Sequence, residues 1–179
     1  RSHSIETTVE LSGKEEGVIV ACGGFTGGYT LFSKNNKVFY DYNYYNGLYY
    51  TLESPRLPKG EVDIKFNFIE TGGDEARIPG GKGELYINGK KVDEVDMPEM
   101  HISTFSLSET FDVGVDAGTP VSNKYRVKNH YPYSGDLDKV VVRLTDSYPR
   151  CQDATFAPRL MPISLTCVGT GASPMLPGS

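Results

Sequence analysis

The chain has 179 residues, a formal net charge of −5 at pH 7, 38% hydrophobic residues and no tryptophan. This length suits one domain that buries a core of its own, and the acidic balance argues against nucleic acid as the main partner. No apolar run approaches the roughly 18 residues of a membrane-spanning helix, so we expect no membrane partner either. The compartment stays open, because the three cysteines form no motif that indicates a redox environment.

Hydrophobic residues recur with a period of two along most of the chain, which is typical of strands. The predicted strands are, in chain order, residues 5–11, 18–22, 29–33, 37–45, 49–52, 62–69, 84–88 and 91–95. Asn35-Asn36, Asn46-Gly47 and Asn88-Gly89 separate such runs, and Asn and Gly tolerate the positive φ of tight hairpin turns. Many short strands at this spacing predict an all-β sandwich or barrel.

The last part of the chain differs from the rest in composition and in hydrophobic pattern. After Leu144 the alternation fades and Pro, Gly and Ser become dense. We therefore expect a β-sandwich domain over residues 1–144 and an irregular tail over residues 145–179, outside the sandwich. Cys151 and Cys167 in this tail could pair, although nothing in the sequence requires it, and Cys22 lies in an apolar run where we expect it to be buried.

Six tyrosines gather between residues 38 and 52, in the run VFYDYNYYNGLYYTL. Tyr40, Tyr42 and Tyr44 occupy alternate positions and therefore share one face of a strand. Asn46-Gly47 then turns the chain, so that the later tyrosines pair across a hairpin. Sheet packing explains most of this cluster. If a glycan site exists, the face carrying Tyr40, Tyr42 and Tyr44 is the predicted ligand-binding surface, provided that these rings are exposed.

The string EVDMPE contains Glu94, Asp96 and Glu99 in an E-x-D-x-x-E pattern. Alternate residues of a strand share a face, and retaining glycosidases need two carboxyl groups roughly 5 Å apart. The pattern therefore raises a glycan hydrolase as an alternative function. Pro98 interrupts the strand at the point where the second carboxylate should be held, which favours a polar edge after a hairpin.

A second acidic group follows in SETFDVGVDAGTPVS, where Glu109, Asp112 and Asp116 lie within eight residues. Carboxylates and backbone carbonyls in a loop can coordinate calcium, which takes six to eight oxygens in flexible geometry. The more ordinary interpretation is that these side chains accept hydrogen bonds from loop N–H groups. Calcium is the only cofactor that the sequence raises.

Several segments together resemble a known family: EGVIVACGGFTGGYTLFSKNNKVFYDYN, GKGELYINGKKV, FSLSETFDVGVDAGTPVS and YPYSGDLDKVVVRL occur in the order found in the C-terminal accessory region of large bacterial arylsulfatases. The resemblance covers about residues 1–144 and implies a two-sheet antiparallel jelly-roll sandwich of the concanavalin or laminin-G kind. It does not extend to sulfatase activity, because Ser54 stands directly before Pro55 and so lacks the S-x-P-x-R spacing of a sulfatase nucleophile.

The resemblance implies a non-catalytic module that binds a glycan or docks on a sulfatase-type catalytic domain. The alternative is the β-sandwich glycan hydrolase that would use Glu94, Asp96 and Glu99.

Overall fold

The computed structural model describes residues 1–45, 47–71, 80–100, 109–128, 130–145 and 153–156. These residues form strands, turns and loops, with no helix among them and hence none that could cross a membrane. The strands are β1 (His3–Leu11), β2 (Gly17–Gly24), β3 (Gly27–Lys34), β4 (Lys37–Tyr45), β5 (Leu48–Glu53), β6 (Gly60–Glu70), β7 (Gly81–Ile87), β8 (Lys90–Met97), β9 (Phe111–Val113), β10 (Val140–Leu144) and β11 (Asp153–Phe156).

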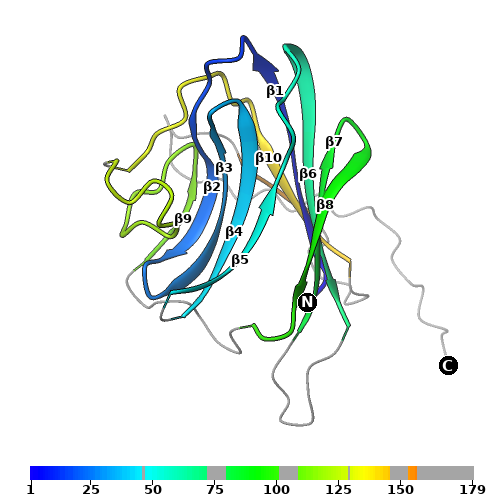
Figure 1. Cartoon of the computed structure of the whole chain (residues 1–179), viewed down its shortest axis with the longest axis vertical. Helices are drawn as coiled ribbons and strands as arrows, with labels where there is room; N and C mark the ends of the chain where they lie inside the picture. Colours follow the sequence, from blue (N-terminus) through cyan, green and yellow to red (C-terminus); the bar gives the residue numbers. More distant parts are fainter. Residues whose placement is uncertain (46, 72–79, 101–108, 129, 146–152, 157–179) are drawn as a thin grey trace, which may run out of the picture.

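Two antiparallel sheets pack face to face, which confirms the predicted all-β sandwich (Figure 1). The six-stranded sheet has the order β11-β10-β1-β6-β7-β8, and the five-stranded sheet has the order β5-β4-β3-β2-β9. Tight turns join β2 to β3, β3 to β4 and β7 to β8, and Asn35, Asn36 and Asn88 adopt positive φ in two of them, as their positions predict. The chain passes from one sheet to the other between β1 and β2, β5 and β6, β8 and β9, and β9 and β10.

The core lies between the sheets and follows from the alternation of the strands. In β6 the side chains of Val62, Ile64, Phe66 and Phe68 are buried, while the residues between them point outward. Facing residues from the other sheet complete the same cluster, among them Leu31, Tyr40, Tyr42 and Leu52. The face of the six-stranded sheet that points away from this core is therefore the polar one.

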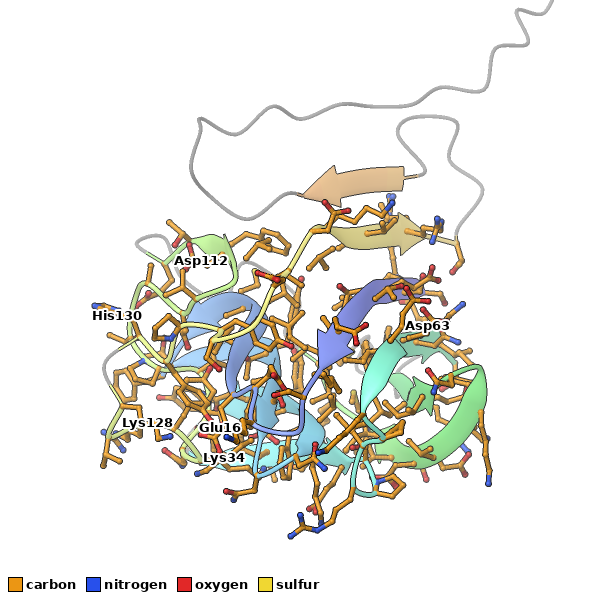
Figure 2. The ribbon with its side chains drawn as sticks, turned by 90° about the horizontal axis from the view of Figure 1, so that it is seen from above. Glu16, Lys34, Asp63, Asp112, Lys128 and His130 are labelled. Atoms are coloured by element: carbon orange, nitrogen blue, oxygen red, sulfur yellow. The ribbon has the colours of Figure 1, made fainter. Side chains whose placement is uncertain are left out.

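The five-stranded sheet is covered on both faces. A covering segment, residues 114–128 and 130–133, crosses its outer face and places Val121, Tyr125 and Tyr131 against Phe32 and Phe39. Figure 1 shows this segment outside β2 and β9. Lys128 and Glu16, both labelled in Figure 2, form an ion pair of 3.0 Å that ties the segment to the β1–β2 connection. The covering segment explains why β4 is buried on both of its faces.

The strand β11 changes the expected domain boundary. Asp153–Phe156 pairs with β10 as the edge of the six-stranded sheet, with Val140 opposite Phe156 and Arg143 opposite Asp153. The prediction that the chain leaves the sandwich after Leu144 is therefore wrong for these four residues. Cys151 and Cys167 lie outside the described residues.

Candidate functional site

The outer face of the six-stranded sheet carries the best candidate for a binding site. Because side chains alternate along each strand, β1, β6 and β7 turn polar groups outward between their core residues. An open hollow of about 620 Å³ lies there, and we call it the outer-face hollow. Its lining residues are Glu6, Thr7, Thr8, Asp63, Ile64, Lys65, Asn67, Tyr86 and Gly89. Figure 2 shows Asp63 on the side of β6 that faces away from the five-stranded sheet.

One end of the outer-face hollow is fixed by an ion-pair cluster around Glu6. The carboxylate of Glu6 lies 3.0 Å from Lys65 Nζ and also pairs with Arg143 of β10. Partial burial acts to raise the pKa of Glu6, but the hydrogen bonds from Lys65 and Ser4 and the two positive charges outweigh it and lower the pKa. Glu6 is therefore ionised at neutral pH, and it holds Lys65, which lies between Glu6 and Tyr86 in the register of the three strands.

The other end is fixed through Tyr86. Its hydroxyl donates a hydrogen bond of 2.7 Å to Glu84, and Lys91 Nζ lies 3.2 Å from the same carboxyl group. The hydrogen bond from Tyr86, helped by Lys91, lowers the pKa of Glu84, and the same hydrogen bond raises the pKa of Tyr86. The phenol stays protonated, and its half-buried ring is held in one orientation beside Lys65, its register partner on β6.

The floor between these two ends offers hydrogen-bonding groups that are only partly used. Thr8 donates a hydrogen bond of 2.7 Å to Oδ1 of the exposed Asp63, while Asp63 forms no ion pair with any described residue. Asn67 lies next to Lys65 on the outward side of β6 and brings an amide that both donates and accepts. The outer-face hollow thus combines one fixed aromatic ring with a carboxylate, an amide, a hydroxyl and an ammonium group.

The structure does not support the tyrosine face that the sequence predicts as a ligand-binding surface. Tyr40 and Tyr42 are 1% and 0% exposed and lie in the core between the sheets, while Tyr44 is half-buried against the same core. The hairpin itself is confirmed, because Tyr42 pairs with Tyr50 and their rings stack at 6.3 Å. The prediction required exposed rings, and it is wrong for Tyr40 and Tyr42 because their face of β4 is the inner one.

The predicted acid pair of a hydrolase is not assembled. Glu94 and Asp96 do share the outward face of β8, but both are exposed, and Lys82 Nζ lies 3.2 Å from Glu94 and 3.9 Å from Asp96. The hydrogen bonds from Lys91 and Lys82 lower the pKa of Glu94, whereas a general acid needs a raised one. Glu99 follows Pro98, beyond the end of β8.

The three predicted calcium ligands accept hydrogen bonds within the loop, as the more ordinary interpretation of this segment expects. Glu109 accepts hydrogen bonds from the N–H and hydroxyl of Thr119, and Asp112 accepts them from Thr110 Oγ1 and Ala117 N. Asp116 accepts from Val121 N at 2.9 Å and from Tyr125 at 2.7 Å. Across the described part of the chain, no group of three or more His, Cys, Asp or Glu side chains could hold a metal ion.

Burial raises the pKa of Asp116, which is 1% exposed, because the charged carboxylate loses its hydration in the loop. This carboxyl group orders the covering segment through Val121 and Tyr125. It therefore has a structural role that its place in the sequence does not reveal.

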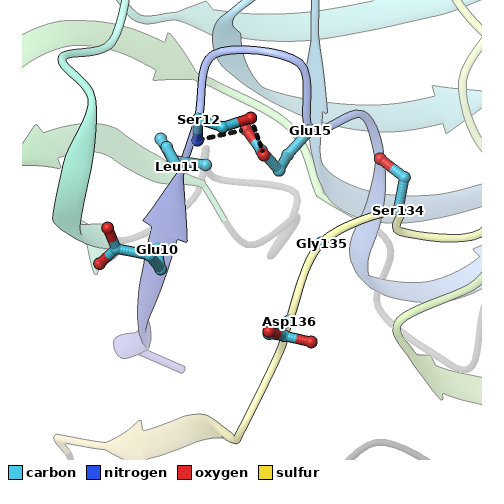
Figure 3. A pocket seen from close by; sticks show the side chains of 7 residues that line it. All are labelled: Glu10, Leu11, Ser12, Glu15, Ser134, Gly135 and Asp136. Carbon is cyan, nitrogen blue, oxygen red and sulfur yellow. Dashed lines mark hydrogen bonds between the residues drawn. The ribbon is translucent and has the colours of Figure 1, made fainter.

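A second hollow, of about 390 Å³, lies at one end of the sandwich between the β1–β2 connection and residues 134–136 (Figure 3). Glu10, Glu15 and Asp136 are among its lining residues. Glu15 is turned into its own connection, where it accepts hydrogen bonds from the N–H groups of Ser12, Gly13 and Lys14. This hollow lacks an aromatic ring in its lining and is the weaker candidate.

Two turns of the five-stranded sheet expose large apolar side chains at the same end of the molecule. Phe25 lies in the β2–β3 turn, and Tyr45 and Leu48 flank the β4–β5 turn, with exposures of 56%, 60% and 46%. Both turns lie at the lower end of that sheet in Figure 1. We call these three residues the apolar tip. Cys22, expected to be buried, is instead half-buried in β2 with its thiol free, and burial raises its pKa.

No residue of the outer-face hollow is among the sequence-predicted site residues, although the sequence carries a signal for three of them. The alternation in VDIKFNFI places Asp63, Lys65 and Asn67 on the polar face of one strand. These three side chains form a candidate ligand site only together with Tyr86, which is one of the six tyrosines outside the dense cluster. Only the pairing of β6 with β7 brings it beside them.

Comparison with models of protein families and with curated proteins gives no match. Among solved structures, the chain is similar to the receptor binding domain of the botulinum neurotoxin C/D mosaic serotype, with 11% identity and a TM-score of 0.45 over 89% of this chain and 34% of that one. It is also similar to the botulinum neurotoxin serotype D binding domain, with 12% identity and a TM-score of 0.45 over 89% of this chain and 34% of that one.

A third similar structure, the botulinum neurotoxin type G receptor binding domain, has 14% identity and a TM-score of 0.41 over 58% of this chain and 28% of that one. The chain thus spans about a third or less of the length of these structures. Similarity at this level assigns no function, which has to be inferred from the chain's own residues.

Proposed function

We propose that this chain is a non-catalytic glycan-binding module and that the outer-face hollow is its binding site. The observation that carries the proposal is the ring of Tyr86, held by Glu84 beside the polar side chains of Asp63, Lys65 and Asn67. The volume of about 620 Å³ falls in the range of small-ligand sites. The site stands on three adjacent strands, and strands hold side chains more rigidly than loops do.

The chemistry of the outer-face hollow suits a sugar. A pyranose ring presents an apolar face of C–H groups and a rim of hydroxyls. The tyrosine ring can pack against this apolar face, as tyrosine does at positions that are partly exposed to solvent. The carboxylate of Asp63 accepts hydrogen bonds, Lys65 donates them, and the Asn67 amide does both. Since the partners of Tyr86 and Lys65 already fix these side chains, little conformational entropy would be lost on binding.

A glycan array that includes neutral and sulfated polysaccharides tests the proposal, followed by calorimetry on the strongest ligand. We expect Tyr86→Ala to weaken binding by about tenfold or more, because it removes the ring. Tyr86→Phe keeps the ring and should bind within about threefold of the wild type. Tyr45→Ala at the apolar tip is the matched control and should not change binding. The proposal fails if no glycan binds, or if Tyr86→Ala binds as well as the wild type.

The second candidate partner is a sulfatase-type catalytic domain, as the resemblance to the arylsulfatase accessory region implies. The apolar tip favours it, because large exposed apolar side chains at one end of a domain are typical of contact surfaces between proteins. The test is titration with a purified bacterial arylsulfatase catalytic domain that lacks its own C-terminal region. A complex that Phe25→Ser abolishes and Tyr86→Ala leaves intact would support this candidate, and the absence of any complex would contradict it.

A further inference from the structure

The charges around the outer-face hollow restrict the kind of glycan that fits. Four basic side chains on this face of the sheet are Lys65, Lys82, Lys91 and Arg143, and each is ion-paired. Lys65 and Arg143 share Glu6, and Lys91 lies 2.6 Å from Glu94 and 3.2 Å from Glu84. A sulfate group that approached one of these basic side chains would compete with a carboxylate that already lies beside it.

The same face carries more negative than positive groups. The carboxylates that β1, β6, β7 and β8 turn to this face are Glu6, Glu10, Glu61, Asp63, Glu84, Glu94 and Asp96, seven against four basic groups. Within the hollow itself, Glu6 and Asp63 outnumber Lys65. Of these, Asp63 is exposed and forms no ion pair with a described residue, so an anion that entered the hollow would meet its charge directly.

The carboxylates that repel an anion attract an uncharged ligand rich in hydroxyl groups. An ionised carboxylate only accepts hydrogen bonds, and its bonds to hydroxyl donors are shorter and stronger than those between neutral groups. Asp63 accepts from Thr8 through Oδ1, which leaves Oδ2 to accept from a sugar hydroxyl. No existing ion pair has to break for this contact to form.

Resting on the proposed glycan function, we infer that the ligand class of the outer-face hollow is a neutral glycan rather than a sulfated one. The module would then recognise sugars before sulfation or after its removal. The carboxylates of Glu6 and Asp63 in the outer-face hollow would disfavour a sulfated polysaccharide.

The test uses the whole chain and pairs of oligosaccharides that differ only by O-sulfation, on an array and then by calorimetry. We expect the neutral member of a binding pair to bind at least about tenfold more tightly than its sulfated partner. Between about 50 and 500 mM NaCl its affinity should change by less than about twofold, because no ion pair forms on binding. Asp63→Asn should reduce the affinity ratio between the neutral and the sulfated member, because the loss of the negative charge improves binding of the sulfated member.

Two results would overturn the inference, and they differ in what they say of the proposed function. Tighter binding of the sulfated member that weakens with salt and depends on Tyr86 would refute the neutral ligand and leave glycan binding intact. Binding of neither member of any pair would refute glycan binding itself, and the inference with it.

Discussion

Tyr40 of β4 and Phe66 of β6 stack across the interior of the sandwich, with ring centroids 3.6 Å apart and ring planes 10° apart. The contact joins the two sheets at their centre. We expect Tyr40→Leu and Phe66→Leu each to lower the free energy of unfolding by about 1–2 kcal/mol. The double variant should lose about 0.5–1.5 kcal/mol less than the sum of the two, as aromatic pairs do.

Urea unfolding followed by far-UV circular dichroism measures this coupling. The control pairs Tyr40→Leu with Phe32→Leu, since Phe32 packs on the opposite face of the five-stranded sheet. That pair should be additive. Additivity of Tyr40 and Phe66 would show that the two rings do not stack in solution.

The buried carboxylate of Asp41 holds the covering segment to β4. Asp41 is 1% exposed, pairs with Lys124 at 2.6 Å, and accepts hydrogen bonds from Ser122 and Thr51. Asp41→Ala would leave the ammonium group and both hydroxyls without their acceptor, so we expect a loss of about 2–4 kcal/mol in unfolding free energy. Lys128→Met, which removes an exposed ion pair, should cost less than about 1 kcal/mol. Equal effects of the two variants would contradict this role of Asp41.

Glu15 gives the β1–β2 connection a pH-dependent stability. The hydrogen bond from the Ser12 hydroxyl, together with those from backbone N–H groups, lowers the pKa of Glu15 to about 2 from the ordinary value of 4.5. A lowered carboxyl pKa contributes stability that is present above about pH 4.5 and is lost as the pH falls towards 2. We expect Glu15→Gln to cost about 1 kcal/mol at pH 7, as the loss of a capping side chain does.

The difference between the wild type and Glu15→Gln should shrink as the pH falls, which urea unfolding at a series of pH values measures. Glu10→Gln, in the same hollow, should change stability by less than about 0.5 kcal/mol at pH 7. A difference that stays constant down to the acid limit would mean that the carboxylate does not cap the connection.

Calcium should have no effect on stability, because Glu109, Asp112 and Asp116 are engaged with N–H and hydroxyl donors of their own loop. A ligand that binds only the folded state raises the melting temperature by mass action. We therefore expect the same melting temperature in millimolar CaCl₂ and in EDTA. A rise in melting temperature with calcium that Asp116→Asn abolishes would show that these carboxylates bind the ion.

Removal of residues 146–179 tests whether β11 belongs to the six-stranded sheet. Without β11, β10 becomes the edge, and those of its N–H groups that point away from β1 lose their partners. We expect these amides to exchange hydrogen faster and the melting temperature to fall. Unchanged exchange in β10 would show that Asp153–Phe156 does not pair with it in solution.

The sequence predicts the parts of this fold that depend on local pattern. The alternation of β6 and the hairpin around Tyr42 and Tyr50 both follow from a period of two and a turn signal. Local pattern cannot tell which face of β4 turns inward, and for that reason the sequence predicts a binding surface at Tyr40, Tyr42 and Tyr44 only on the condition that their rings are exposed. The order of strands in each sheet decides it, together with the covering segment.

In the candidate site, too, some features follow from local sequence pattern and others depend on tertiary contacts. Asp63, Lys65 and Asn67 can be placed on one polar face from the sequence, whereas Tyr86 joins them only through the pairing of β6 with β7. The burial of Asp116 depends on Tyr125 and Val121, which reach it through the folding of the covering segment. Contacts of this kind leave no periodic signal in the chain.

The most direct test of glycan binding at the outer-face hollow is a nuclear magnetic resonance titration of the isotope-labelled chain with the oligosaccharide that the array selects. The backbone amides of Thr8, Lys65 and Tyr86 should shift in proportion to occupancy, and those of Phe25 and Leu48 should stay in place. Shifts confined to the apolar tip, with the outer-face hollow unchanged, would contradict the proposed site.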